Sequence, residues 1–209
     1  MVKFRDRKEA GQRLADLLWQ KISDIKNGIV LALPRGGVVV GREVAKKLNL
    51  PLDIIVTRKI GAKENPEYAV VAVSAHSIVY GNSVWIDKSY IEEEIQAQRE
   101  EIERRMREYR RDEPYPVLKG KTVILVDDGL ATGLSMQAAI EEVKLRKPAK
   151  VILALPVAPP DSLKKIKPMV DETIVLSEEP LFFAVGQFYE NFEAVPDEEV
   201  KNLLSTNSN

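Results

Sequence analysis

Two adjacent carboxylates, Asp127 and Asp128, have the residue type and setting best suited to chemistry. They lie in the stretch TVILVDDGLATGLSMQAAI, where an apolar run predicted as a buried strand leads into a loop of small residues and then a helix. Such a loop suits an anion, because free backbone N–H groups and the positive end of the helix dipole meet there. Carboxylates, by contrast, accept hydrogen bonds from hydroxyl groups. The predicted ligand therefore has vicinal hydroxyls at one end and a phosphate at the other, as a ribose 5-phosphate does.

The two kinds of group are expected to divide this ligand between them. Both carboxylates accept from the 2- and 3-hydroxyls of the ribose, and the loop amides with the Thr132 hydroxyl bind the 5-phosphate. The alternative is an acidic strand end that only caps the following helix. The residues assigned to the ribose 5-phosphate are Asp127, Asp128, Gly129, Leu130, Ala131, Thr132, Gly133 and Ser135.

The segment VILVDDGLATGLS, residues 123–135, resembles the ribose-phosphate signature of the type I phosphoribosyltransferases. Walker and dinucleotide-binding patterns are both absent. The motifs LPRGG, RKIGA, NPE, DDGLATG and FYENF together look most like the uncharacterised phosphoribosyltransferase-like proteins. The resemblance implies transfer of a phosphoribosyl group from phosphoribosyl diphosphate (PRPP) to a nitrogenous acceptor, typically a nucleobase, in nucleotide metabolism.

The resemblance also implies a second loop, which binds the diphosphate after the first core strand. The segment LPRGGVVVG fits this role, because glycines let backbone N–H groups approach the ligand and arginine adds a forked cationic contact. A cation at the end of the next strand is implied too, with Lys59 preferred over Arg58. The alternatives are an ordinary strand-to-helix turn and a charged strand end in solvent. The diphosphate set is Pro34, Arg35, Gly36, Gly37, Arg58 and Lys59, and the catalytic set is Asp127, Asp128, Lys59 and Arg35.

The implied chemistry passes through an oxocarbenium-like ribose while charge grows on the leaving diphosphate. Mg²⁺ is the expected cofactor, held mainly by the ligand, with Asp127 or Asp128 contributing through water. Two other readings stay open at this point. One is a non-catalytic sensor of PRPP or a nucleotide on the same fold, and the other is a hydrolase or phosphotransferase, for which no nucleophile or general base is evident.

Several further segments have two interpretations each. The aromatic residues of the tail could stack a planar base or anchor the tail to the sheet. The segment KENPEYA, residues 63–69, could approach the diphosphate or form a proline turn. The only histidine, His76, is expected at a hairpin tip as a surface residue. The tail aromatics are Phe182, Phe183, Phe188, Tyr189 and Phe192.

The elements that would position these residues alternate between strand and helix, which predicts an α/β fold with a parallel sheet. Strands are expected at residues 29–33, 52–59, 122–126, 151–155 and 172–176. Helices are expected at residues 6–25, 38–48, 132–146 and near Ser162. A hairpin and a long charged helix, residues 89–111 with a Ser89–Glu92 capping box, form an insertion at about residues 60–118. The predicted division is a core at residues 1–176 and a tail or hood segment at residues 177–209.

Composition excludes several classes of protein. The 209 residues carry a net charge of -1, so nucleic acid is not an expected partner. With no cysteine and one histidine, disulfides, thiol catalysis and multi-histidine metal sites are excluded. No apolar run approaches ~18 residues and no signal-peptide core is evident, so a cytoplasmic protein without a membrane partner is expected. The thin apolar seam of the long helix leaves a homodimer open.

Overall fold

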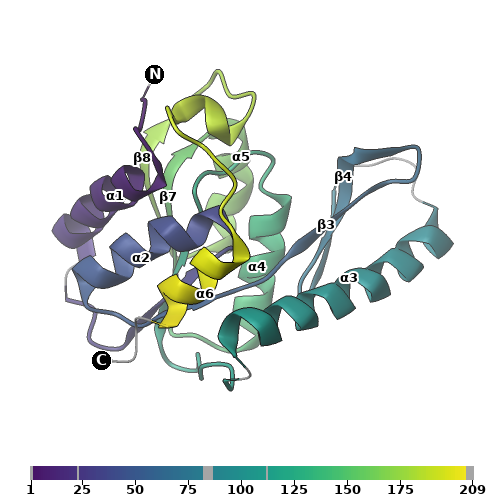
Figure 1. The fold of residues 1–209 in the computed structure, drawn as a ribbon, viewed down its shortest axis with the longest axis horizontal. Helices are drawn as coiled ribbons and strands as arrows, with labels where there is room; N and C mark the ends of the chain where they lie inside the picture. Colours follow the sequence, from purple (N-terminus) through teal and green to yellow (C-terminus); the bar gives the residue numbers. More distant parts are fainter. Residues whose placement is uncertain (1, 23, 82–86, 112, 206–209) are drawn as a thin grey trace.

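The structure is a computed structural model that describes residues 2–22, 24–81, 87–111 and 113–205, apart from the side chain of Glu67. A five-stranded parallel sheet is covered by helices on both faces, and a smaller antiparallel sheet with a long helix stands to one side (Figure 1). The α/β class predicted from the sequence is confirmed.

The strands of the central sheet are continuous apolar runs, as expected where both faces of a parallel sheet are covered. The middle strand pairs with its neighbour from Gly28↔Thr122 to Ala32↔Val126. Parallel pairing in this register brings the carboxyl ends of the two strands, and the loops that follow them, side by side. The strand order is β2 (Leu52–Ile54), β1 (Gly28–Ala32), β6 (Thr122–Val126), β7 (Lys150–Ala158) and β8 (Glu172–Glu178).

Alternate residues of each strand face opposite sides of the sheet, and two separate cores result. In β1, Val30 and Ala32 face the first core, while Ile29 and Leu31 face the second. The first core is covered by α1 (Arg7–Ile22) and α2 (Gly36–Leu48), and the second by α4 (Leu134–Leu145) and α5 (Pro160–Ile166).

Two helices begin at other residues than the sequence predicts. α2 begins at Gly36 instead of Val38, so Gly36 and Gly37 lie in its first turn. α4 begins at Leu134 instead of Thr132, because Gly133 takes φ +83° directly before it, a conformation open to glycine at no steric cost. As a result, Gly36 and Gly37 lie within the first turn of α2, and Thr132 lies in the loop before α4. Backbone N–H groups are exposed at both of these helix starts.

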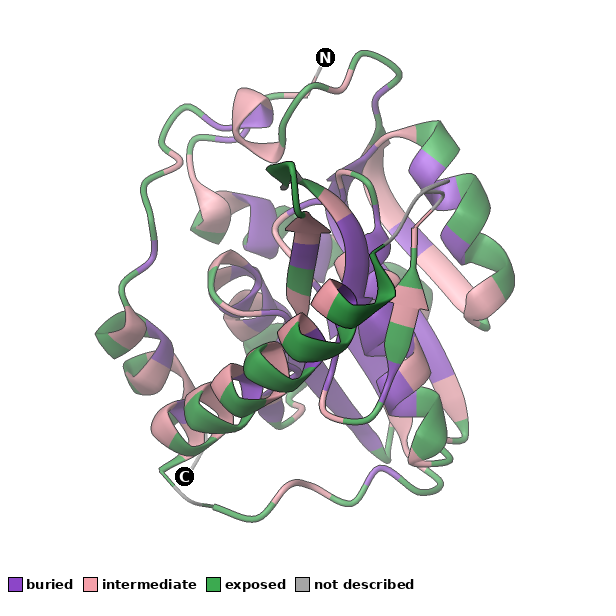
Figure 2. Ribbon diagram, turned by 90° about the vertical axis from the view of Figure 1, so that its right-hand side faces the viewer, coloured by how far each residue is buried: buried purple, intermediate pink, exposed green. Residues whose placement is uncertain are grey.

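The predicted hairpin and long helix form the second unit. Its strands β3 (Arg58–Ala62), β4 (Asn65–Val73) and β5 (Ile78–Tyr80) are antiparallel, and the pairing Val73↔Ile78 confirms the hairpin. The helix α3 (Lys88–Arg110) covers them, and Figure 2 shows its mostly exposed outer surface in front of the buried strands.

Two local predictions in this region are wrong. Residues 52–59 are not one strand, because β2 ends at Ile54 and Arg58 begins β3 in the other sheet. An apolar run indicates strand character but not the sheet that the strand joins. The cap of α3 is Asp87, whose Oδ1 accepts from the Tyr90 N–H at 3.2 Å, and not Ser89.

The tail returns to the N-terminus. Phe4 pairs with Tyr189 in an isolated parallel bridge, and both are buried with Phe188 and Val157. After η1 (Lys167–Met169), the tail contains η2 (Val185–Phe188) and α6 (Asp197–Ser205), which packs on α2 and α3. Among the described residues, no helix is long and apolar enough to cross a membrane.

Candidate functional site

The two carboxylates lie at the carboxyl edge of the sheet, where ligands of open α/β sheets bind. Asp127 and Asp128 directly follow β6, and the neighbouring β1 leads into the Pro34–Gly37 turn. The Leu33 N–H donates to the Val126 carbonyl at 3.0 Å and joins the two strand ends. The loops predicted for the ribose and for the diphosphate are therefore neighbours.

The glycines of the turn pack directly on the carboxylates. A Cβ atom added to Gly36 would overlap Oδ2 of Asp128, and one added to Gly37 would lie 2.8 Å from Oδ1 of Asp127. No residue larger than glycine fits there without displacing an acid. The structure thus brings the PRGG and DDGLATG motifs together as one site, although 90 residues separate them in the chain (Asp127 minus Gly37).

The loop between β6 and α4 is held from outside. The Leu130 N–H donates to the Val157 carbonyl at 3.0 Å, and the Ser162 hydroxyl donates to the Ala131 carbonyl at 2.5 Å. Thr132 is exposed, and no side chain caps the start of α4. The first N–H groups of a helix have no partner within it, so this loop can bind an anion.

Arg7, at the start of α1, enters the site although the sequence did not single it out. Its Nε donates to Asp128 Oδ2 at 2.7 Å, and its Nη1 donates to the Glu193 carbonyl at 2.7 Å. The guanidinium lies 3.8 Å from the centre of the Phe192 ring, and the side chain is only 12% exposed. In the charged N-terminal sequence no pattern sets Arg7 apart from its neighbours Arg5 and Lys8.

The electrostatics of the two acids are those of a buried like-charge pair. Burial raises the pKa of Asp127 well above its usual value, and repulsion by Asp128 raises it further. Burial also raises the pKa of Asp128, while the ion pair with Arg7 opposes the rise. Asp127 Oδ1 accepts from the Asp128 N–H at 2.8 Å. Such a pair is typical of functional sites.

The three cations predicted for the diphosphate lie in different surroundings. Lys59 is exposed on β3, and its charge opposes the rise in the pKa of Asp127. Arg58 donates from Nε to Gln98 Oε1 at 2.9 Å, on α3. Arg35, joined to Pro34 by a cis peptide bond, has its Nη1 3.6 Å from Asp197 Oδ1 at the start of α6. Of the three, Lys59 acts on the charge of Asp127, whereas both guanidinium groups are engaged elsewhere.

The tail contacts the site through a tyrosine. The Tyr189 hydroxyl donates to the Asp128 main-chain carbonyl at 2.6 Å, and the Tyr189 ring lies 5.0 Å from that of Phe192. Phe182 packs on Phe188 at 4.8 Å between ring centres. These four aromatic residues anchor the tail.

Phe183 differs from the other tail aromatics, because 90% of it is exposed. The loop that bears it is held by Gln187, whose Oε1 accepts from the Phe183 N–H at 2.8 Å and whose Nε2 donates to the Leu181 carbonyl at 2.7 Å. Val185 of this loop contacts Gly129. An exposed ring is thus fixed on a loop that touches the ribose-phosphate segment.

Two other segments considered from the sequence have partners of their own. Lys63 of the KENPEYA segment has its Nζ 3.2 Å from Asp87 Oδ2. His76 is exposed at the hairpin tip as predicted, and its Nδ1 lies 2.9 Å from Glu142 Oε1.

The donor set fits Mg²⁺ only with help from a ligand. Among the described residues, no group of three or more His, Cys, Asp or Glu side chains could hold a metal ion. Mg²⁺ is commonly bound by one or two carboxylates together with substrate phosphates and water. Asp127 and Asp128 can supply such carboxylates, although Oδ2 of Asp128 is already paired with Arg7.

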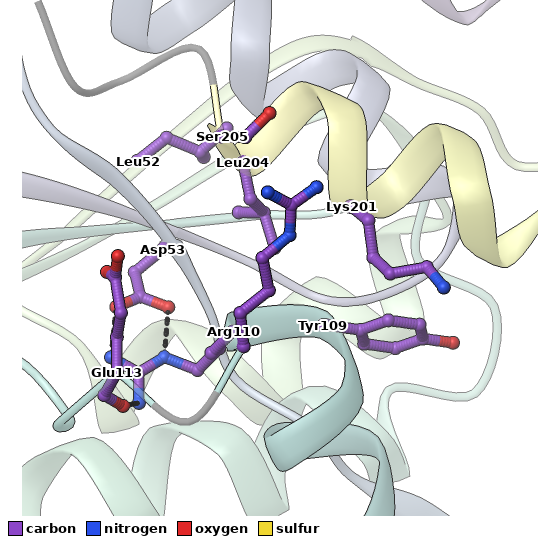
Figure 3. Close-up of a pocket in the computed structure, with 9 residues that line it drawn as sticks. Leu52, Asp53, Tyr109, Arg110, Glu113, Lys201, Leu204 and Ser205 are labelled. Atoms are coloured by element: carbon purple, nitrogen blue, oxygen red, sulfur yellow. Dashed lines mark hydrogen bonds and ion pairs between the residues drawn. The ribbon is translucent and has the colours of Figure 1, made fainter.

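A polar cavity of about 310 Å³ lies apart from these motifs, between β2, the end of α3 and α6 (Figure 3). Arg110 pairs there with both oxygens of Asp53 at 2.9 and 3.0 Å and also donates to the Glu113 and Pro114 carbonyls. Lys201 pairs with Glu198 and Glu108. These charged groups satisfy one another, which is typical of a structural network.

Comparison with known proteins indicates the family of this chain. Residues 3–191 match the phosphoribosyl transferase domain. A Mycobacterium tuberculosis protein, Rv0571c, named only as a candidate phosphoribosyl transferase, is 38% identical over 98% of this chain. The chain spans about half the length of the curated relatives it matches, 47%.

Solved structures show the same relationship. The crystal structure of TT1426 from Thermus thermophilus covers 97% of this chain and 98% of its own, with a TM-score of 0.81 and 42% identity. A purine phosphoribosyltransferase from Pyrococcus horikoshii covers 94% and 99%, with a TM-score of 0.52 and 17% identity, and shares the fold. The chain belongs to the phosphoribosyl transferase domain family.

Proposed function

We propose that this protein is a Mg²⁺-dependent phosphoribosyltransferase that moves the phosphoribosyl group of PRPP to a nitrogenous acceptor and releases diphosphate. The observation that supports it most is the contact between the glycine turn and the two carboxylates, Gly36 on Asp128 and Gly37 on Asp127. A substrate with both a diol and a diphosphate needs this combination of groups within one site.

The ribose is assigned to the carboxylates. Each acid has one oxygen held by the protein, since Asp127 Oδ1 accepts from a backbone N–H and Asp128 Oδ2 accepts from Arg7. We assign one of two vicinal hydroxyls to the other oxygen of each acid, in place of the contact that the two carboxyl groups make with each other. Both acids are buried and repel each other. A hydrogen bond from a ribose hydroxyl therefore stabilises these carboxylates more than a hydrogen bond from water stabilises a carboxylate at the protein surface.

The phosphates are assigned to the two helix starts. The loop before α4, with Thr132 and Ser135, would bind the 5-phosphate, and the start of α2 at Gly36 and Gly37 would bind the diphosphate. Lys59 would contribute a positive charge, and Mg²⁺ would neutralise the leaving diphosphate when it is bound.

The acceptor is assigned to the tail, residues 177–209, which we propose acts as the hood of the site. Phe183 offers an exposed ring on a loop that touches Gly129, and a flat ring of this kind suits a planar base. In the reaction, the bond between the anomeric carbon and the diphosphate oxygen breaks and a bond to the acceptor nitrogen forms. The electron pair leaves with the diphosphate, and the acceptor nitrogen releases its proton.

The test is to incubate the pure protein with PRPP, Mg²⁺ and a panel of purines, pyrimidines and small amines, and to measure diphosphate release. We expect release that requires one acceptor class and stops when Mg²⁺ is chelated. Tight PRPP binding without release for any acceptor would favour a PRPP sensor instead. Release that is independent of every acceptor would indicate a hydrolase.

A further inference from the structure

The guanidinium group of Arg7 lies next to Gly36, in the turn at Pro34–Gly37. A Cβ atom on Gly36 would lie 2.6 Å from Arg7 Nε, so this side chain touches the turn assigned to the diphosphate. Arg35 and Arg58 belong to the motifs LPRGG and RKIGA, but they pair with Asp197 and Gln98. The chain therefore brings an arginine from its N-terminal helix to a position that the motif arginines do not occupy.

Arg7 retains hydrogen-bonding capacity in this position. A guanidinium has five N–H donors, and the protein uses Nε for Asp128 and Nη1 for the Glu193 carbonyl. Within the described part of the chain, no acceptor pairs with Nη2. Phe192 supports the plane of the group from one face at 3.8 Å. A guanidinium held at one edge and on one face presents its remaining donors in a fixed direction, which suits phosphate oxygens.

We propose that Arg7 binds a phosphate oxygen of the diphosphate part of PRPP, an inference that rests on the proposed function. Asp128 then has two tasks: one oxygen orients Arg7 and the other accepts from the ribose. The tail has a task as well, because Glu193 and Phe192 complete the support of Arg7. The N-terminal helix, the tail and the two motif loops together form one substrate site.

The test compares two ligands that differ by the diphosphate. Calorimetry in the presence of Mg²⁺ measures the affinity for PRPP and for ribose 5-phosphate in the wild type, in Arg7→Gln and in Arg7→Lys. We expect Arg7→Gln to weaken PRPP about tenfold or more and ribose 5-phosphate less than about threefold. Arg7→Lys keeps a charge for Asp128 but loses the fork, so it should weaken PRPP by an intermediate factor and provides the test if Arg7→Gln does not fold.

The control is Arg13→Gln. Arg13 lies on the same helix, pairs with Glu9 at 3.9 Å and stacks over the Phe4 ring at 4.8 Å, so it matches Arg7 in type but not in site. Its substitution should leave the ratio of the two affinities unchanged. If both ligands weaken equally in the Arg7 variants, or neither weakens, the proposed contact is wrong. If the wild type binds neither ligand, the proposed function fails together with it.

Discussion

Two buried carboxylates near the two ends of α4 have opposite surroundings. Glu142, with 4% of its side chain exposed, accepts from the Ser74 hydroxyl at 2.7 Å, the His76 N–H at 2.8 Å and Arg146 Nη2 at 2.9 Å. Burial alone would raise the pKa of Glu142, but the hydrogen bonds from His76, Ser74 and Arg146 outweigh it and lower the pKa to about 2. This acid docks the β4–β5 hairpin onto α4.

Asp127, just before α4, has the reverse situation. Burial and the charge of Asp128 raise its pKa, and its Oδ1 accepts from the Asp128 backbone N–H at 2.8 Å. Burial of an acid is therefore not in itself a sign of function. An acid surrounded by donors serves the fold, whereas an acid held beside a like charge is poised for donors that a ligand brings.

Replacing both Asp127 and Asp128 is the strongest test of the contrast between Asp127 and Glu142. Asp127→Asn combined with Asp128→Asn should weaken PRPP by on the order of 100-fold or more, because two charge-assisted hydrogen bonds to the ribose are lost. The free energy of unfolding should fall by less than the double loss of buried acids would suggest, because removal of the like-charge repulsion offsets the weakened ion pair between Asp128 and Arg7. Calorimetry and thermal unfolding measure the two quantities, and unchanged PRPP affinity would show that the ribose does not bind these acids.

Replacing Glu142 should instead lower stability and leave PRPP affinity almost unchanged. Glu142→Ala should lower the free energy of unfolding by about 3 kcal/mol, because the buried Ser74 hydroxyl and the part-buried donors of His76 and Arg146 lose their acceptor. Glu142→Gln, which keeps one amide oxygen, should cost less. The folded fraction should bind PRPP within about threefold of the wild type. Denaturant unfolding checks the first value, and a variant as stable as the wild type would contradict the structural role.

The sequence predicted the motif half of this site because its signals are local. Asp127 and Asp128 directly follow one buried apolar strand and Gly36 and Gly37 come within five residues of the end of another, and parallel strands bring such positions to one edge. Arg7 could not be found in this way, because 121 residues separate it from Asp128. The N-terminal segment is brought to the site by contacts with the tail, among them the bridge between Phe4 and Tyr189 and the hydrogen bond from the Asn191 N–H to the Arg5 carbonyl at 2.9 Å.

The same limit explains the errors in the fold. The run at residues 52–59 has strand character throughout, yet the main-chain path changes sheets after Ile54. Whether a tail phenylalanine anchors or is exposed depended on distant partners too: Phe188 is buried with Phe4, and Phe183 is not. Periodicity determines which elements form, and contacts across the chain determine what each one faces.

The dependence of stability on pH should separate the two acids further. Glu142 has a folded pKa of about 2 and an ordinary value of 4.5, so its stabilisation is present above pH 4.5 and is lost as the pH falls toward 2. The difference between the wild type and Glu142→Gln should stay constant from about pH 6 to 8 and shrink by about 2 kcal/mol in acid.

Asp127 has a raised folded pKa, so its ionisation costs stability, and this cost grows as the pH rises above the unfolded value. Asp127→Asn should therefore gain stability over the wild type as the pH increases. Denaturant unfolding of the wild type and both variants across pH 3 to 8 gives, for each variant, the difference in free energy of unfolding from the wild type as a function of pH. If this difference changed with pH in the same direction for both variants, the distinction between the two acids would be lost.

A third acid tests whether a low pKa alone indicates a structural role. Hydrogen bonds from Arg104 and Arg105 lower the pKa of Glu101 to about 2, as for Glu142, but Glu101 lies on the solvent side of α3 with 27% of its side chain exposed. Solvent screens such pairs, so Glu101→Gln should change the free energy of unfolding by less than about 0.5 kcal/mol. Denaturant unfolding beside Glu142→Gln is the measurement. If Glu101→Gln and Glu142→Gln lowered the free energy of unfolding equally, burial of the acid would not matter for its contribution to stability. The contrast between Glu142 and Asp127 would then depend only on the number of hydrogen-bond donors around each acid.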